Sequence, residues 1–196
     1  MKLIRFTALP ALSAIIFFLP VSAYAHTGLG HGSGFLSGFI HPVGGFDHLL
    51  AMVAVGIWAS QNRGKAIWAL PAAFVGVMLL GAILGMIGLS LPFIEGGVIS
   101  SVLILGVLIA AATRMPLATG LIITGIFAMF HGHAHGTEMP LSASGAAYGA
   151  GFAAATLLLH LGGIITAVLA EKTAGTRLIR YSGAVIAVAG VYLFFA

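Results

Sequence analysis

The stretch HPVGGFDH at residues 41–48 runs directly into an apolar segment, Leu49 to Ala59, that reads as soluble in lipid. It places two imidazoles and a carboxylate, those of His41, Asp47 and His48, at the mouth of that segment. An ionisable side chain in or beside hydrocarbon is costly unless it is paired or lies in a solvated cavity. We therefore interpret the stretch as a pathway or binding site within a membrane-spanning fold.

The composition of the whole chain agrees with a membrane protein. Of its 196 residues, 60% are hydrophobic and only 6% are charged, and the mean hydropathy is +1.15. Such a chain cannot cover a soluble surface with polar groups. The formal charge of +4 arises from scattered side chains that form no basic patch, so no nucleic-acid partner is expected. The absence of cysteine excludes disulfides, thiolate metal sites, iron–sulfur clusters and cysteine nucleophiles.

The amino terminus has the pattern of a secretory signal. Lys2 and Arg5 precede an apolar run at residues 6–21, which closes with the small residues Ala23 and Ala25 around Tyr24. This pattern predicts a cleaved signal peptide at residues 1–25, and an uncleaved anchor helix is the alternative. Residues 26–38 then form a Gly/His-rich outer leader, whose His26 and the new terminal amine are a possible weak chelate.

Six apolar segments follow, each near the ~20 residues that a ~30 Å hydrocarbon layer requires. The sequence therefore predicts an all-α membrane protein, a six-transmembrane-helix bundle after a cleaved signal peptide, with residues 39–196 as its membrane domain. The expected spans are Phe39 to Ser60, Ala66 to Leu89, Gly96 to Thr113, Leu117 to Ala134, Ser142 to Ala170 and Leu178 to Ala196. Small residues four apart, as at Gly81 and Gly85 or Gly145 and Gly149, predict close helix contacts.

The distribution of basic residues predicts the orientation. Alternating six spans places every Lys and Arg of the membrane domain on one face and none on the other; these are Arg63, Lys65, Arg114, Lys172, Arg177 and Arg180. Basic loops are cytoplasmic, so the amino terminus is expected outside, in agreement with the signal peptide. Glu95 and Glu138 then fall in outer linkers.

A second polar cluster, FHGHAHGTE at residues 130–138, ends the fourth span. His131 and His135 are four residues apart and share a helix face, which can point two imidazoles at one cation, while His133 is expected to face away. The alternative is a polar helix end wetted by lipid headgroups.

Counting back to the nearest inner charge at ~1.5 Å per residue places the histidines by depth. His48 lies ~22 Å and His131 ~26 Å above the inner face, His41 ~33 Å if the helix continues, and His160 ~16 Å, near the midplane. This descent from the outer surface suits capture of a cation from outside. Imidazole and carboxylate ligands without thiolate favour nickel, cobalt or zinc over copper(I).

The two motifs and their separation resemble the HupE/UreJ family of nickel or cobalt permeases, and the similarity covers the whole chain. The resemblance implies a secondary, non-ATP uptake permease, not an enzyme, that moves a divalent transition-metal ion, most often nickel, from periplasm to cytoplasm. It implies a multi-pass protein of the inner (plasma) membrane with a periplasmic mature N-terminus and a His/Asp-lined path between the first and fourth spans. The functional positions carried over are His41, Asp47, His48, His131 and His135, with Glu138 beside them.

Several further expectations complete this hypothesis. Gly44 and Gly45 after Pro42 would let the backbone of the first span break. His160 would be the next metal-binding residue inward or, alternatively, a histidine hydrogen-bonded to a neighbouring helix. No GxxxxGK[ST] loop is present, so the membrane potential or proton exchange would drive transport. The expected partners are the metal ion as substrate, the lipid bilayer and a second copy of the chain in a homo-oligomer, with no tightly bound cofactor.

Two other classes of protein remain open at this stage. The first is a b-type cytochrome, in which His48, His131 and His160 would ligate haem. The second is an intramembrane hydrolase, for which the chain lacks an HExxH pair and offers only Ser101 or Ser144 as a nucleophile near a histidine.

Overall fold

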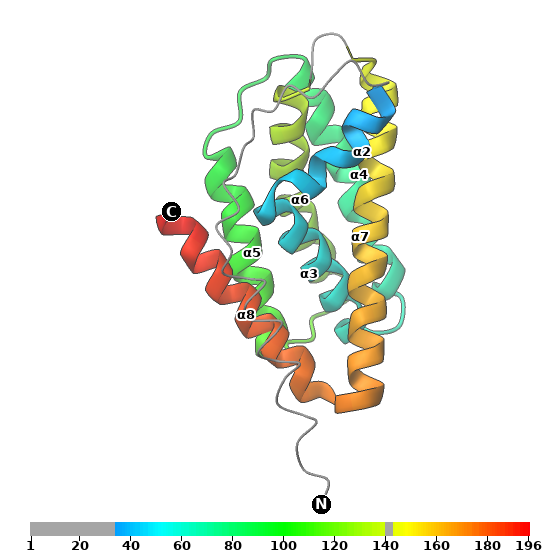
Figure 1. The fold of residues 1–196 in the computed structure, drawn as a ribbon, viewed down its shortest axis with the longest axis vertical. Coiled ribbons are helices and arrows are strands. Elements are labelled where there is room, and N and C mark those ends of the chain that lie inside the picture. The colour runs from blue at the N-terminus through cyan, green and yellow to red at the C-terminus, as the bar shows by residue number, and fades with distance from the viewer. Residues whose placement is uncertain (1–33, 140–142) are drawn as a thin grey trace, which may run out of the picture.

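The computed structural model describes residues 34–139 and 143–196, and every element in these ranges is a helix. The all-α prediction is therefore confirmed for this part of the chain, while the predicted signal peptide and most of the leader lie outside the described residues. Figure 1 shows the helices as one elongated bundle. They are α2 (Gly34–Gly44), α3 (Phe46–Asn62), α4 (Ala66–Met86), α5 (Ile94–Ala110), α6 (Leu117–Thr137), α7 (Gly145–Ala174) and α8 (Thr176–Phe195).

Four of these helices, α4, α6, α7 and α8, are long and apolar enough to cross a membrane, and α2 with α3 makes a fifth candidate if the bent pair is one span. The remaining predicted span, α5, is an apolar helix of 17 residues, about 26 Å long. The chain thus has the helices of a membrane protein. The predicted boundary at Phe39 is wrong, because the first described helix already begins at Gly34.

The predicted break after Pro42 is present and is sharp. α2 and α3 meet at an angle of 85°. Gly45 between them has extended backbone angles, φ −102° and ψ 121°, and α3 begins at the next residue. The depth of ~33 Å expected for His41 is therefore wrong, because α2 turns away from the axis of α3 instead of continuing it.

Glycines bring α4 and α6 into close contact. A Cβ atom added to Gly132 or Gly136 of α6 would overlap the carbonyl oxygens of Met78 and Ala82 in α4, so these backbones touch. The predicted contact at Gly81 and Gly85 is confirmed from the other side, where the nearest atoms are α6 backbone, whereas the nearest atoms to an added Cβ on Gly145 and Gly149 belong to side chains. Because Gly132 and Gly136 each follow a histidine, packing on α4 turns His131 and His135 toward α3.

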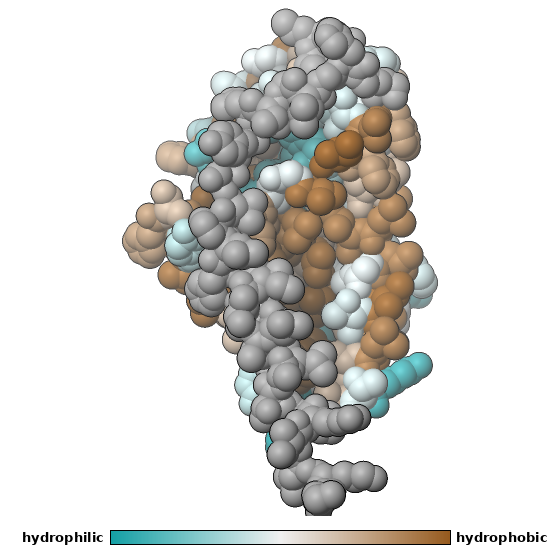
Figure 2. Space-filling model, viewed as in Figure 1, coloured by the Kyte–Doolittle hydropathy of each residue, from teal (hydrophilic) through white to brown (hydrophobic). Residues whose placement is uncertain are grey.

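Polar contacts join the C-terminal end of α3 to the loop between α5 and α6 and to the end of α7. Trp58 Nε1 donates to the Thr113 carbonyl oxygen at 3.1 Å, and Asn62 Oδ1 accepts from the Met115 backbone N–H at 2.9 Å. Arg63 forms an ion pair with Glu171 at the end of α7. Arg63, Arg114 and Glu171 also line one cavity of about 200 Å³. Figure 2 shows apolar side chains along the side where α7 lies, and hydrophilic ones at its lower end.

Candidate metal site

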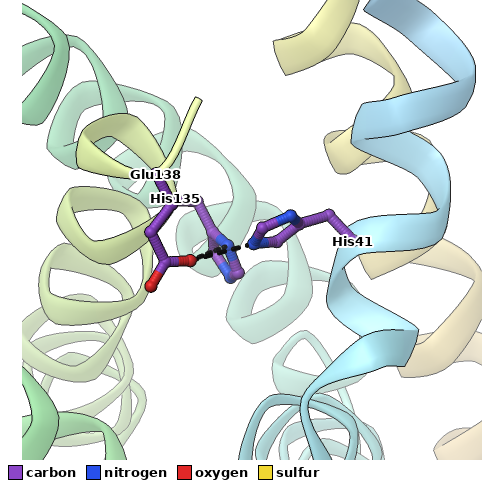
Figure 3. A group of neighbouring side chains, drawn as sticks. All are labelled: His41, His135 and Glu138. Atoms are coloured by element: carbon purple, nitrogen blue, oxygen red, sulfur yellow. Dashed lines mark hydrogen bonds and ion pairs between the residues drawn. The ribbon is translucent and has the colours of Figure 1, made fainter. Parts of the chain in front are cut away.

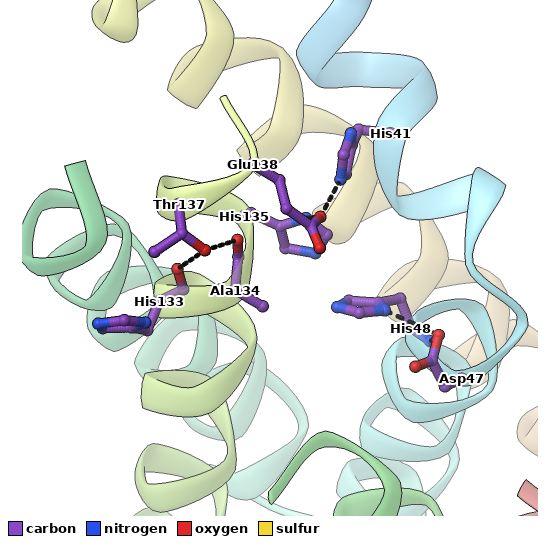
Figure 4. Close-up of polar contacts among 8 residues, drawn as sticks. All are labelled: His41, Asp47, His48, His133, Ala134, His135, Thr137 and Glu138. Atoms are coloured by element: carbon purple, nitrogen blue, oxygen red, sulfur yellow. Dashed lines mark hydrogen bonds and ion pairs between the residues drawn. The ribbon is translucent and has the colours of Figure 1, made fainter. Parts of the chain in front are cut away.

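Four imidazoles from two separate parts of the chain form one row at the broken end of α3. His41 comes from α2, His48 from the first turn of α3, and His131 and His135 from the last turns of α6. In the order His41, His135, His48, His131, successive ring centroids are 4.6, 4.2 and 4.7 Å apart. We call these four residues the histidine row. The two sequence motifs, some 90 residues apart, are thus brought into direct contact (Figure 4).

The outer end of the row includes a carboxylate. Side-chain ligand atoms of His41, His135 and Glu138 all lie within 4.8 Å of one another, close enough to hold one ion (Figure 3). His41 Nε2 donates to Glu138 Oε2 at 3.0 Å. This hydrogen bond lowers the pKa of the Glu138 carboxyl below its usual value, so Glu138 is an anion at neutral pH. The three residues combine two imidazoles and one negative charge.

Asp47 lies behind His48 and orients it. Its Oδ1 atom accepts the His48 backbone N–H at 2.7 Å and the ring Nδ1 at 2.8 Å. A carboxylate can only accept, so His48 carries its proton on Nδ1 and leaves a lone pair on Nε2. Figure 4 shows the His48 ring between Asp47 and His135. This arrangement matches the carboxylate–histidine pairs that orient ligands in metal sites. In this structure Asp47 acts on the row through His48.

Four buried nitrogens of the row lack a hydrogen-bond partner within the described residues. His48 Nε2, His131 Nδ1 and both ring nitrogens of His135 are buried, and none has a hydrogen-bond partner among the described residues. A buried polar atom without a partner costs free energy, and native proteins rarely leave several together. A cation bound among these lone pairs would remove that cost.

The two ends of the row differ in exposure. The Glu138 side chain is 53% exposed and that of His41 29%, whereas that of His135 is 2% exposed, that of His48 12%, and His131 is fully buried. The cluster therefore has one end open to an ion from outside and one end inside the bundle.

His133 points away from the row, as the sequence predicts. Its Nε2 atom donates to the carbonyl oxygen of Leu89, beyond α4, at 2.5 Å. Figure 4 shows its ring on the opposite side of α6 from His135 and His48. His133 therefore provides a matched comparison for the histidines that face the row.

His160 of α7 is buried but is not part of the row. The ring of Phe74 lies between them, 5.5 Å from the His131 ring and 5.1 Å from the His160 ring. Both ring nitrogens of His160 lack a hydrogen-bond partner within the described ranges. The alternative interpretation, that the His160 ring forms a hydrogen bond with a neighbouring helix, is therefore wrong as far as the described residues are concerned.

Comparison with known proteins gives the family. The family model described as HupE / UreJ protein matches residues 14–193. The chain belongs to the HupE/UreJ family. The relative Protein HupE from Rhizobium leguminosarum bv. viciae is 47% identical over 175 residues, which cover 89% of this chain and 91% of that protein. No solved structure matches. The resemblance that the two histidine motifs indicate is thus confirmed.

The structure of this HupE/UreJ member adds residues that the sequence motifs do not mark. Phe152 of α7 packs on His135 with ring centroids 4.0 Å apart, and Tyr148 lies 5.8 Å from the His41 ring. Ser101 of α5 contacts His131. Each is a single residue within an apolar helix, and only the packing of α5 and α7 against α3 and α6 brings it to the row. Pattern alone gives no signal for Phe152 or Tyr148, and it suggests Ser101 only as a candidate nucleophile near a histidine.

Gly45 has a steric role at the site that its neighbour does not share. A Cβ atom at residue 45 would lie 2.8 Å from Asp47 Oδ1 and 3.0 Å from His48 Nδ1, whereas one at Gly44 would meet nothing within 4 Å. We expect Gly45→Ala to displace the Asp47–His48 pair and weaken Ni²⁺ binding by about tenfold, the lower range for loss of an orienting partner. Gly44→Ala should bind as the parent does. Calorimetric titration of the purified variants measures both, and equal affinities would contradict the steric role.

Proposed function

We propose that this chain is a secondary uptake permease for a divalent transition-metal ion, nickel in the first place. The ion would enter from the periplasm, bind in the histidine row between the first and fourth spans, and leave to the cytoplasm. The proposal takes α2 with α3 as one broken span and α5 as a short span, which gives six spans in the inner (plasma) membrane. The bound metal is the substrate, and no enzymatic reaction is assigned.

One observation carries this proposal: the row of unpartnered imidazole nitrogens where the two motifs meet. The rings that carry these nitrogens come together from distant parts of the sequence, the nitrogens have no hydrogen-bond partner among the described residues, and one end of the row is exposed. A site that only stabilised the fold would satisfy its buried nitrogens with protein donors or acceptors. Broken helices in a membrane also expose backbone where an ion must lose water, which suits the 85° break next to His48.

The ligand atoms favour nickel, cobalt or zinc. Imidazole nitrogen is the main donor, with carboxylate oxygen from Glu138 at the outer end. Copper(I) prefers thiolate and thioether ligands, while magnesium and calcium require more oxygen atoms than this row offers. Membership of the HupE/UreJ family, which the sequence resemblance associates with nickel and cobalt transport, supports nickel as the first choice.

The charge distribution supports inward transport. Arg63, Arg114 and Glu171 lie together at the end of the bundle opposite the row. Basic loops mark the cytoplasmic side, so the row opens toward the periplasm. Beyond Phe74, His160 offers the next unpartnered nitrogens and is our candidate for the following station inward.

The membrane potential is a sufficient driving force. A divalent cation that enters a negative-inside cell gains roughly 4.6 kcal/mol per 100 mV. This equals more than about three powers of ten in concentration. Exchange of protons for metal on the histidines is the alternative source of coupling. Uptake measured with the potential and the pH gradient clamped separately distinguishes the two.

Uptake of radioactive nickel into cells that express the chain tests the proposal. We expect uptake above that of cells with an empty vector, reduced by excess unlabelled nickel and by cobalt more than by magnesium. Accumulation in the inner membrane is checked by fractionation. Equal uptake with and without the chain, at confirmed membrane levels, would overturn the permease assignment.

The absorption spectrum of the purified protein tests the haem alternative. The His48 ring contacts that of His131, and the ring of Phe74 lies against both His131 and His160, which leaves no space for a porphyrin between the three histidines of that alternative. We therefore expect no Soret band in the absorption spectrum of the purified protein after growth with a haem precursor. A Soret band that disappears on His48→Ala would favour the cytochrome instead.

A further inference from the structure

The pair of Ser101 and His131 joins α5 to the inner end of the histidine row. Ser101 is fully buried, and its Oγ atom lies 2.9 Å from His131 Nε2. The same oxygen lies 2.6 Å from the backbone carbonyl oxygen of Val98, one turn earlier in α5. The serine therefore stands between a carbonyl and an imidazole.

The chemistry of these three groups settles where the protons are. Two oxygens 2.6 Å apart need a hydrogen between them, and a carbonyl has none, so the Ser101 hydroxyl donates to Val98. The hydroxyl has one hydrogen, and its oxygen can then only accept from His131. His131 must therefore carry its proton on Nε2.

This assignment also decides between a nucleophile and a positioning group. In a serine–histidine catalytic pair the hydroxyl donates its proton to the imidazole. Here the hydroxyl proton points to Val98, away from the ring, so Ser101 is not activated as a nucleophile. In the contact between Ser101 and His131, the imidazole is the donor and the hydroxyl oxygen is the acceptor, which is the reverse of the arrangement in a hydrolase.

The other ring nitrogen is thereby left as a lone pair. His131 Nδ1 is buried and has no hydrogen-bond partner among the described residues, and its ring contacts that of His48. We propose that Ser101 is a positioning residue that fixes the tautomer of His131, so that Nδ1 is the atom that binds the metal. His48, held by Asp47, presents Nε2 instead. This inference rests on the proposed function for the identity of the bound metal. The assignment of the His131 proton to Nε2 does not depend on the proposed function.

The tautomer can be measured without metal or transport. Protein labelled with ¹⁵N in histidine is purified without metal, and the His131 imidazole signals are identified by their loss in His131→Ala. We expect a protonated Nε2 and an unprotonated Nδ1 in the parent, and a mixture or the reverse in Ser101→Ala. A parent protein with the proton on Nδ1 would overturn the inference, even if that protein transports nickel.

Affinity for Ni²⁺ separates a positioning role from simple packing. We expect Ser101→Ala to weaken Ni²⁺ binding by at least about tenfold, as loss of an outer-shell partner does, with Ser101→Thr close to the parent and Ser101→Val impaired. Ser182→Ala is the matched control, because Ser182 makes the same bond to the carbonyl three residues back, that of Ile179, and forms no hydrogen bond with any of the described histidines.

A double substitution completes the test. In a His131→Ala background, Ser101→Ala should weaken binding no further, because its effect passes through His131. An equal loss in both backgrounds, or impaired binding by Ser101→Thr and Ser101→Val alike, would mean that Ser101 only fills space. A correct tautomer in a parent that takes up no nickel would overturn the permease proposal and leave the proton assignment standing.

Discussion

His135→Ala should reduce nickel uptake to the background of cells without the chain. His135 lies at the centre of the histidine row, in contact with the rings of both His41 and His48, and neither of its nitrogens has a hydrogen-bond partner in the described part of the chain. Its removal deletes a ligand and separates the exposed end of the row from the buried end. We expect Ni²⁺ affinity to fall by at least about 100-fold, the upper range for loss of an orienting partner.

His133→Ala is the matched control for this prediction. The two histidines are two residues apart in the same helix, but His133 bonds to the Leu89 carbonyl on the far side. We expect uptake by His133→Ala within about twofold of the parent, at equal amounts of protein in the membrane. Background uptake by His133→Ala together with normal uptake by His135→Ala would place the ion on the other face of α6 and contradict the site.

Asp47→Ala should impair uptake almost as severely as His48→Ala. Without the carboxylate, His48 loses the acceptor that keeps its proton on Nδ1, and the ring can turn or change tautomer so that Nε2 no longer offers a lone pair. The site also loses a negative charge near the row. We expect Ni²⁺ binding weaker by about 10- to 100-fold in Asp47→Ala.

The double variant shows whether Asp47 acts through His48. If it does, Asp47→Ala with His48→Ala should bind no more weakly than His48→Ala alone, since coupled residues are not additive. Asp47→Asn, which keeps an acceptor oxygen without the charge, should lie between Asp47→Ala and the parent. Fully additive losses would instead make Asp47 an independent ligand of the ion, as the sequence alone suggested.

The sequence predicts which ionisable side chains come together, although whether they bind a metal stays a prediction. Ionisable residues in an apolar chain are rare enough to be conspicuous, and four of them, His41, His48, His131 and His135, do come together. The helical spacing of α6 also predicts correctly that His133 faces away. Glycines explain part of this success, because Gly132 and Gly136 fix the face of α6 that meets α4.

The sequence could not predict how α2 is oriented or what surrounds the row. The Pro and Gly residues at 42–45 indicate a break but not its angle of 85°, which depends on the packing of α2 against α7. The same holds for Phe74, an ordinary member of an apolar helix until the fold places it beside His131, and for Ser101, which the sequence suggests only as a candidate nucleophile and not as a positioning partner of His131. Residues that act through tertiary contact alone leave no periodic signal.

The closely packed core around α3 sets a limit on throughput. Met52, Val55 and Trp58 are fully buried between the row and the C-terminal end of α3, and Gly56 touches the α7 backbone. If the row binds a transported ion, as we propose, that ion could pass this core only when helices move, and such collective motions take microseconds to milliseconds. Each copy would thus carry ions one at a time, with a rate that saturates as external metal rises. The total rate of metal uptake by a cell would then depend on the number of copies of the protein in its membrane.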